Sequence, residues 1–221
     1  MADSHGKPET IAKASDFLKK MGCGTIFHLG DICDSLRPET AGPCIEIIKA
    51  NHIRAIKGNN DHILALNLKN GSDTGESFET MNYLNALPQN IECHNAMFTH
   101  SLPFEMELGA SAMIGKMGTV EAERFFSARP ETLLFRGHSH LPKIIFPETP
   151  VKKIEDAVAK NAVSAARSSA ISPGQKIDLK NRRSCVITCG ALMDGVCMIW
   201  RPEQSALSCH CFDGSLKRRL L

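Results

Sequence analysis

Long hydrophobic runs are missing from this sequence of 221 residues, and none reaches the ~18 apolar residues that a membrane-spanning helix requires. The first twenty residues contain Asp3, Glu9 and Asp16, and they lack the apolar stretch of a secretion signal. We therefore expect neither a membrane protein nor a protein exported by such a signal.

Aromatic residues are also scarce, at 5% of the chain, and the formal net charge is only +2. The basic residues do not gather into a stripe, so nothing in the sequence marks a nucleic-acid surface. Hydrophobic residues make up 43% and charged residues 23%, which is typical of a globular protein. The length favours one domain over residues 1–221, large enough to bury a sizeable core.

Cysteine is present nine times, an odd number, without the spacing of a disulfide framework. Free thiols are typical of a reducing compartment, so we expect a cytoplasmic protein. Residues 209–211 (Cys-His-Cys) could be read as a metal motif. They lie in a predicted strand near the chain end, and we interpret them as structural. His28, His52 and His94 match no motif, and we interpret them as structural or exposed.

Helix-like and strand-like segments alternate over the first 147 residues. The spacing of apolar residues predicts helices at 8–21, 38–50, 80–87 and 120–128. Strands are predicted at 25–29, 53–57, 96–99 and 132–136. This alternation predicts an α/β fold with a partly parallel sheet.

Beyond residue 147 the composition changes. Residues 151–169 are rich in alanine and lysine with apolar residues at helical spacing, which predicts a helical insertion at about 148–175 on the outside of the domain. Antiparallel strands are predicted at 176–179, 185–188, 196–200 and 206–212.

Five polar clusters contain residue types that bind metals. Four of them follow predicted strands, and one precedes the first helix. Because the carboxyl ends of strands in an open α/β sheet meet at one crevice, these clusters can converge. Residues two apart on an extended segment face the same side, so each Asp-x-His or His-x-His pair can act together. The candidate residues are Asp3, His5, Asp31, Asp34, Asn59, Asn60, Asp61, His100, His138 and His140.

Each of these motifs taken singly is more often a turn or a surface pair. The ordered set of five is much harder to obtain by chance, which favours a functional site. Carboxylate, imidazole and amide groups are ligands for manganese, iron or zinc rather than for calcium.

The order Asp-x-His, Gly-Asp-x-x-Asp, Gly-Asn-x-Asp, His, Gly-His-x-His resembles that of the calcineurin-like metallophosphoesterases over residues 1–200. It is most similar to their small single-domain bacterial and archaeal phosphodiesterases. The resemblance implies a four-layer α/β/β/α sandwich of two mixed sheets flanked by helices. It also implies two divalent metal ions, with manganese expected first and iron, zinc or nickel as alternatives.

Carried over by motif, the resemblance assigns a role to each candidate. Asp31 would bridge the two metals and, with Asn59 and Asn60, would form the catalytic group. Asp34 and Asp61 would support the loops. One metal would be held by Asp3, His5, Asp31 and His140, and the other by Asp31, Asn59, His100 and His138.

The expected reaction is hydrolysis of a small-molecule phosphate ester, most of all a diester, by a hydroxide that bridges the metals. Two alternatives stay open. One is a phosphomonoesterase acting on nucleotides or phosphoproteins, and the other is a non-catalytic metal-binding scaffold on the same fold. The sequence does not fix the oligomeric state.

Two departures from the family pattern carry expectations of their own. Many relatives have a histidine where this chain has Asn60, and asparagine cannot donate a proton to a leaving alcohol. Good leaving groups, or another acid such as His62, are therefore implied. Relatives also carry an apolar strand before Asp-x-His, whereas only Met1 and Ala2 precede Asp3. We expect about five to eight further apolar residues upstream, the length of a strand.

Overall fold

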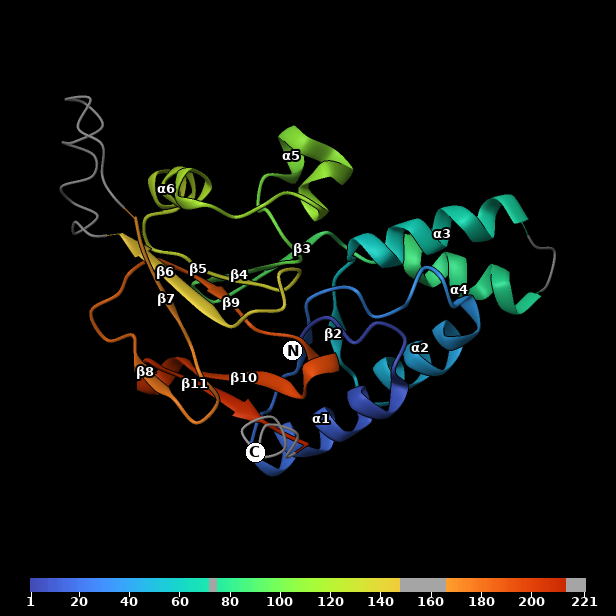
Figure 1. Cartoon of the computed structure of the whole chain (residues 1–221), viewed down its shortest axis with the longest axis horizontal. Coiled ribbons are helices and arrows are strands. Elements are labelled where there is room, and N and C mark those ends of the chain that lie inside the picture. Colours follow the sequence, from blue (N-terminus) through green and yellow to red (C-terminus); the bar gives the residue numbers. More distant parts are fainter. Residues whose placement is uncertain (72–74, 148–165, 214–221) are drawn as a thin grey trace, which may run out of the picture.

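A mixed six-stranded sheet forms the centre of the computed structural model, which describes residues 1–71, 75–147 and 166–213. The strand order is β3-β4-β5-β9-β6-β7 (Figure 1). The strands are β3 (Asn90–Cys93), β4 (Ala96–Thr99), β5 (Leu133–Arg136), β6 (Lys143–Pro147), β7 (Ala166–Ala170) and β9 (Cys185–Thr188). β4, β5 and β9 run parallel, whereas β3 and β6 run antiparallel to their neighbours in that group.

Two smaller sheets lie against it. β8 (Lys176–Asp178), β10 (Val196–Arg201) and β11 (Ala206–Cys211) form an antiparallel sheet. β1 (Phe27–His28) and β2 (Arg54–Ala55) form a parallel pair. Residues 1–3 connect the two: Leu29 N donates to Met1 O at 2.8 Å, and Leu192 N donates to Ala2 O at 2.8 Å. The expected second sheet is therefore present in two parts that the N-terminal residues join.

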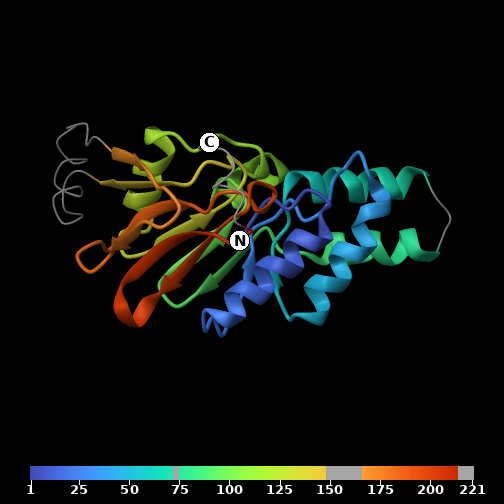
Figure 2. The same cartoon turned by 60° about the horizontal axis from the view of Figure 1, so that its bottom comes forward.

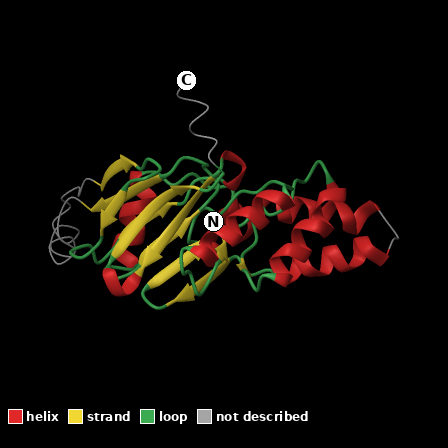
Figure 3. Cartoon of the chain, turned by 90° about the horizontal axis from the view of Figure 1, so that it is seen from below, coloured by secondary structure: helices red, strands yellow, loops and turns green. Residues whose placement is uncertain are grey.

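Helices flank the sheets on both sides and extend beyond one end (Figures 1 and 2). In Figure 3 helices gather at one end of the molecule, and the strands lie toward the other end with further helices beside them. The α-helices are α1 (Pro8–Lys20), α2 (Ala41–Ala50), α3 (Asn59–Gly71), α4 (Gly75–Ala86), α5 (Glu105–Leu108) and α6 (Thr119–Ala128). Short 3₁₀ turns cover Pro38–Thr40, Gly109–Met113, Leu192–Asp194 and Pro202–Gln204.

Three buried clusters show that these elements form four layers. Successive strand residues face opposite sides, so Met97 and Leu134 pack under α6 beside Phe125, whereas Phe98 and Phe135 face the other sheets. A third cluster lies between α1, α2 and β10, where Ile11, Ile48 and Ile199 are buried. The four-layer α/β/β/α sandwich is thus confirmed.

Most predicted elements are present, and two expectations need correction. Residues 59–61 were expected only to end a strand, but they begin helix α3. The helical insertion expected at 148–175 lies outside the described residues over 148–165. Its described part is wrong as a helix, because Ala166–Ala170 pairs antiparallel with β6 as strand β7. In the described part of the chain, no helix combines the length and apolar character needed to cross a bilayer.

Candidate metal centre

The site lies where four strands end. Asp31 follows β1, Asn59 follows β2, and His100 follows β4 directly. The residues after β5 supply His138 and His140. β1 pairs parallel with β2, and β4 pairs parallel with β5, so the strands of each pair end on the same side. Asp3 and His5 come from the N-terminal segment, whose backbone bonds to residues 30–32 beside β1.

The first group of side chains contains Asp3, His5, Asp31 and His140. The Nε2 atoms of His5 and His140 lie 3.1 Å apart. His5 Nε2 lies 3.8 Å from Asp31 Oδ2, and His140 Nε2 lies 3.7 Å from Asp3 Oδ1. Asp3 and Asp31 are buried, whereas the two histidines are partly exposed. Four potential ligand atoms therefore converge at one point that solvent can reach.

The second group contains Asp31, Asn59, His100 and His138. Asn59 Oδ1 lies 3.0 Å from both His100 Nε2 and His138 Nδ1, and these two nitrogens are 3.2 Å apart. His100 Nε2 lies 3.5 Å from Asp31 Oδ1. Two imidazole nitrogens and an amide oxygen thus point at one another, an arrangement suited to sharing a cation.

Asp31 is common to both groups, with one carboxylate oxygen toward each. Asn60 also contacts it: the Asn60 backbone N donates to Asp31 Oδ1 at 2.8 Å, and Asn60 Nδ2 donates to Asp31 Oδ2 at 2.7 Å. Ser35 Oγ donates to Asn60 Oδ1 at 2.9 Å, which fixes the amide orientation. Asn60 therefore lies at the middle of the site, on the first turn of α3.

The backbone of the site is strained. Asp3, His5, Asp31, His138 and His140 all have φ between 46° and 68°, in the left-handed region that non-glycine residues seldom occupy. Such conformations persist only where the surrounding structure enforces them, and they cluster at functional sites. The sharp turns at these residues aim their side chains into the common centre.

Two glycines allow the loops to approach closely. A Cβ on Gly58 would lie 2.1 Å from Asp31 N, and a Cβ on Gly30 would lie 2.7 Å from Gly58 Cα. Gly30 also has φ +82°. Only glycine fits at these contacts, which explains why Gly precedes both Asp31 and Asn59.

Burial changes the titration of the site residues. It raises the pKa of Asp3 well above its usual value, and the neighbouring charge of Asp31 adds to the rise. Burial lowers the pKa values of His5, His100 and His138. The histidines are therefore held neutral, which is the form that binds metals.

The two supporting aspartates contact backbone rather than the centre. Asp61 is fully buried and accepts hydrogen bonds from the backbone N of Cys33 and of Gly58, each at 2.9 Å. Burial, and then the charge of Asp31, raise the pKa of Asp61 to about 6. Asp34 accepts from Arg37 Nε at 2.8 Å, and Arg37 Nη2 donates to His5 O at 3.2 Å.

Sequence reasoning did not place His28 and Arg136 next to the site. His28 was interpreted as structural or exposed, and it is structural. It is fully buried, and its Nε2 lies 3.0 Å from Oγ of Ser4, which stands between Asp3 and His5 in the sequence. Arg136 was considered only as the end of a strand. A charged residue closing the apolar run Leu-Leu-Phe was the available signal for it, whereas the His28 contact had none.

The donor set fits divalent metal ions. Asp3 and Asp31 are two buried carboxylates whose negative charges repel each other, and a cation would offset that repulsion. The other donors are imidazole nitrogens and an amide oxygen, which suit manganese, iron or zinc. Ligand atoms lie within 4.8 Å of one another in two groups of Asp and His residues. The first group is Asp3, His5 and His140, and the second is Asp3, Asp31 and His100.

Comparisons with known proteins bear on the fold and the family. No curated protein matches the chain significantly. Among solved structures, the fold is similar to a metallophosphoesterase from Sphaerobacter thermophilus, with a TM-score of 0.61 and 20% identity, covering 95% of this chain and 85% of that one. It is also similar to TT1561 of Thermus thermophilus, with a TM-score of 0.50 and 10% identity, covering 96% of each chain. These likenesses concern the fold.

The family model supplies the identification. Residues 1–168 match the model described as the calcineurin-like phosphoesterase superfamily domain, and this range contains every candidate site residue. The resemblance seen in the motif order is therefore confirmed: the chain belongs to the calcineurin-like phosphoesterase superfamily, a family of metal-dependent hydrolases.

Proposed function

We propose that this protein is a phosphodiesterase that works with two divalent metal ions, manganese first among them. The observation that supports this most is the convergence of two donor groups on one carboxylate, Asp31. A carboxylate shared between two clusters of donor atoms is what a pair of neighbouring cations requires. The proposed ligands are Asp3, His5, Asp31 and His140 for one ion, and Asp31, Asn59, His100 and His138 for the other.

Two bound divalent ions would acidify a water molecule to make the nucleophile and would offset the charge that gathers on the phosphoryl oxygens. The protein's own residues then orient the ester. The Asn60 amide can donate a hydrogen bond to a phosphoryl oxygen, but it cannot deliver a proton to the departing alcohol. This chemistry favours small-molecule esters with good leaving groups. The preference for diesters rests on the motif order, which resembles that of small single-domain phosphodiesterases.

The location proposed for the enzyme is the cytoplasm. Burial raises the pKa of the Cys185 thiol to about 12 and that of Cys189 to about 11, so these groups stay protonated and unreactive. A protein that carries such thiols suits a reducing compartment.

The test combines metal content with hydrolysis. The protein is purified with manganese, its metal is counted by elemental analysis, and bis(p-nitrophenyl) phosphate and p-nitrophenyl phosphate are compared as substrates. We expect two ions per chain and faster cleavage of the diester. His138→Ala should lower both metal content and rate, whereas His94→Asn, which changes an exposed histidine of the β3–β4 turn, should change neither.

Each alternative has its own outcome. Faster cleavage of the monoester would favour a phosphomonoesterase and reject the diester assignment. Two bound ions with no hydrolysis of either compound would favour the scaffold. Fewer than one ion per chain, with no effect of His138→Ala, would reject the metal centre itself.

A further inference from the structure

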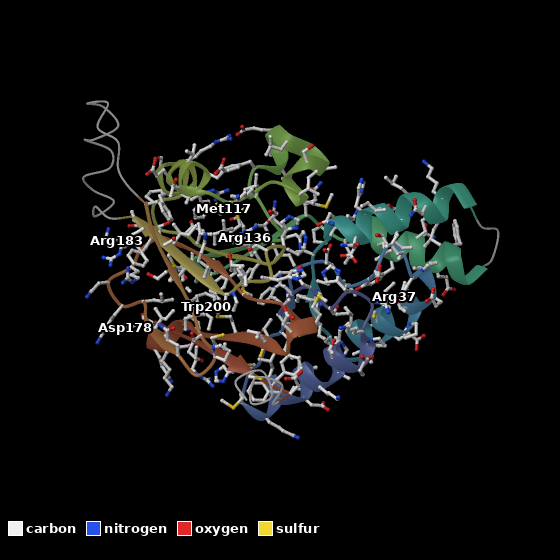
Figure 4. The ribbon with its side chains drawn as sticks, viewed as in Figure 1. Arg37, Met117, Arg136, Asp178, Arg183 and Trp200 are labelled. Carbon is white, nitrogen blue, oxygen red and sulfur yellow. The ribbon has the colours of Figure 1, made fainter. Side chains whose placement is uncertain are left out.

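Arg136 is a buried cation at the end of β5, directly before the Gly-His-Ser-His motif. Arg136 is only 2% exposed to solvent. Figure 4 shows it within the body of the molecule, whereas Arg183 lies at the edge. Among the side chains that the structure describes, no carboxylate oxygen lies within 4.0 Å of its guanidinium. A buried charge without a contact ion pair is costly, so its hydrogen bonds need an explanation.

Those hydrogen bonds go to the loops that carry the histidines. Arg136 Nε donates to Ser101 O at 2.9 Å, and Nη2 donates to Ser101 Oγ at 2.9 Å. Nη1 donates to Ser139 Oγ at 3.2 Å and to Thr188 Oγ1 at 3.2 Å. Ser101 follows His100, and Ser139 lies between His138 and His140. The guanidinium thus contacts both loops and the neighbouring strand β9.

We propose that Arg136 is a positioning residue that holds the His100 loop and the His138–His140 loop in the register needed for metal binding. The inference rests on the proposed metal centre. A planar group with fixed donor directions is suited to this task, because it can bond to both loops at once without changing shape. Gly137 N also donates to His100 O at 3.0 Å, so the guanidinium reinforces an existing contact between the loops.

The experiment separates the fork-shaped donor set from the charge. Arg136→Lys keeps the charge but cannot bond to both loops, and Arg136→Met removes both. We expect Arg136→Lys to weaken Mn²⁺ binding, measured by calorimetry, by about 10–100-fold, the usual effect of losing a group that orients metal ligands. The absorption bands of the Co²⁺-loaded protein should change as well. Thr188→Val is the matched control, since β9 carries no candidate ligand, and it should bind Mn²⁺ almost as wild type does.

Two further measurements make the proposal independent of catalysis. Combining Arg136→Lys with Ser139→Ala should weaken Mn²⁺ binding by less than the product of the separate effects, because both remove the same contact. In the metal-free protein, Arg136→Lys should speed amide hydrogen exchange at Gly137 and His138. If the wild-type protein binds metal but hydrolyses no ester, the proposed function is rejected. The Mn²⁺ affinities of the variants then still test the positioning role of Arg136.

The proposal falls if Arg136→Lys only lowers the melting temperature while Mn²⁺ affinity, the Co²⁺ bands and exchange in both loops stay at wild-type values. If wild type binds no metal, hydrogen exchange decides: unchanged exchange in the two loops would overturn the positioning role. If Arg136→Met fails to fold, the measurements on Arg136→Lys alone test the proposal.

Discussion

Asp31 presents one carboxylate oxygen to each donor group, at 3.8 Å from His5 and 3.5 Å from His100. We expect Asp31→Asn to lower turnover by at least ~10²-fold, the loss found when a main electrostatic group is removed. Asn59→Ala should have a smaller effect, since Asn59 contacts only the second group. Steady-state rates with manganese and metal content measure this. Near wild-type turnover in Asp31→Asn would contradict the bridging assignment.

Asn60 contacts both oxygens of Asp31, and its amide side chain cannot donate a proton to a leaving alcohol. Activated nitrophenyl diesters should therefore be cleaved far better than alkyl diesters. Asn60→His should raise the rate on poor leaving groups, by part of the ~10²–10⁴-fold that a general acid supplies. The measurement is the dependence of rate on leaving-group pKa. A flat dependence in the parent protein would mean that another acid, such as His62, already acts.

At the level of single residues, the motif order predicted which side chains lie together, because glycines and strand ends can be recognised from neighbouring residues in the sequence. The seven proposed ligands do converge, although their binding of metals stays a prediction. Two features of the site could not be recognised from neighbouring residues in the sequence. The left-handed φ values depend on the loops being pressed against one another, and the contact between Ser4 and His28 joins residues 24 positions apart.

Among the elements, the short strands and helix α3 depart most from expectation. β1 and β2 have only two residues each, fewer than the strands predicted at 25–29 and 53–57. α3 was missed because its apolar residues do not line one face. Leu64 and Ala65 are buried, whereas Ile63 is 42% and Leu66 is 47% exposed. Packing against α4, rather than a periodic pattern, determines this helix.

The junction between β2 and α3 provides a prediction about how these two elements pack against the Asp31 loop. In Gly58→Ala the new Cβ would lie 2.1 Å from Asp31 N and 2.3 Å from Asp31 Oδ1, so backbone must move. We expect a loss of about 1–3 kcal/mol in stability and weaker manganese binding. Urea unfolding and calorimetry measure the two effects. Gly24→Ala is the control, because nothing lies within 4 Å of its Cβ position. Equal behaviour of the two variants would contradict the close approach.

For the whole molecule, the resemblance implied four layers, and the three buried clusters have that order. The division of the second sheet into two parts could not be predicted, because it depends on backbone contacts between residues far apart in the sequence. Met1, Phe27 and Trp200 line a cavity of about 350 Å³ between β1 and β10, next to the N-terminal residues. Further residues upstream of Met1 stay a prediction.

Stability against pH reflects the buried histidines as a set. Burial lowers the pKa values of His5, His28, His100 and His138 below 6.5, so between about 4 and 6.5 the unfolded chain binds more protons than the folded one at these groups. Their contribution to stability is present above 6.5 and is lost as the pH falls. The raised pKa values of Asp3 and Asp61 act in the opposite direction, but through fewer groups.

We therefore expect the free energy of unfolding of the metal-free protein to fall between pH 6.5 and pH 4.5, as measured by urea unfolding in EDTA. The neutral histidines explain the sign, since protonation is available only to the unfolded chain. A stability that rises as the pH falls over the same interval would show that the two aspartates outweigh the histidines.

The left-handed backbone at the donors has a consequence for the balance between stability and function. His140, at φ 57°, occupies a conformation that costs an L-residue about 1 kcal/mol or more and costs glycine almost nothing. His140→Gly and His140→Ala should both impair metal binding, yet the glycine variant should melt above the alanine variant in EDTA. Equal melting temperatures would contradict the strain. The residues proposed to bind metal thus weaken the metal-free fold, and a substitution that relieves the strain would be selected against only while the activity is needed.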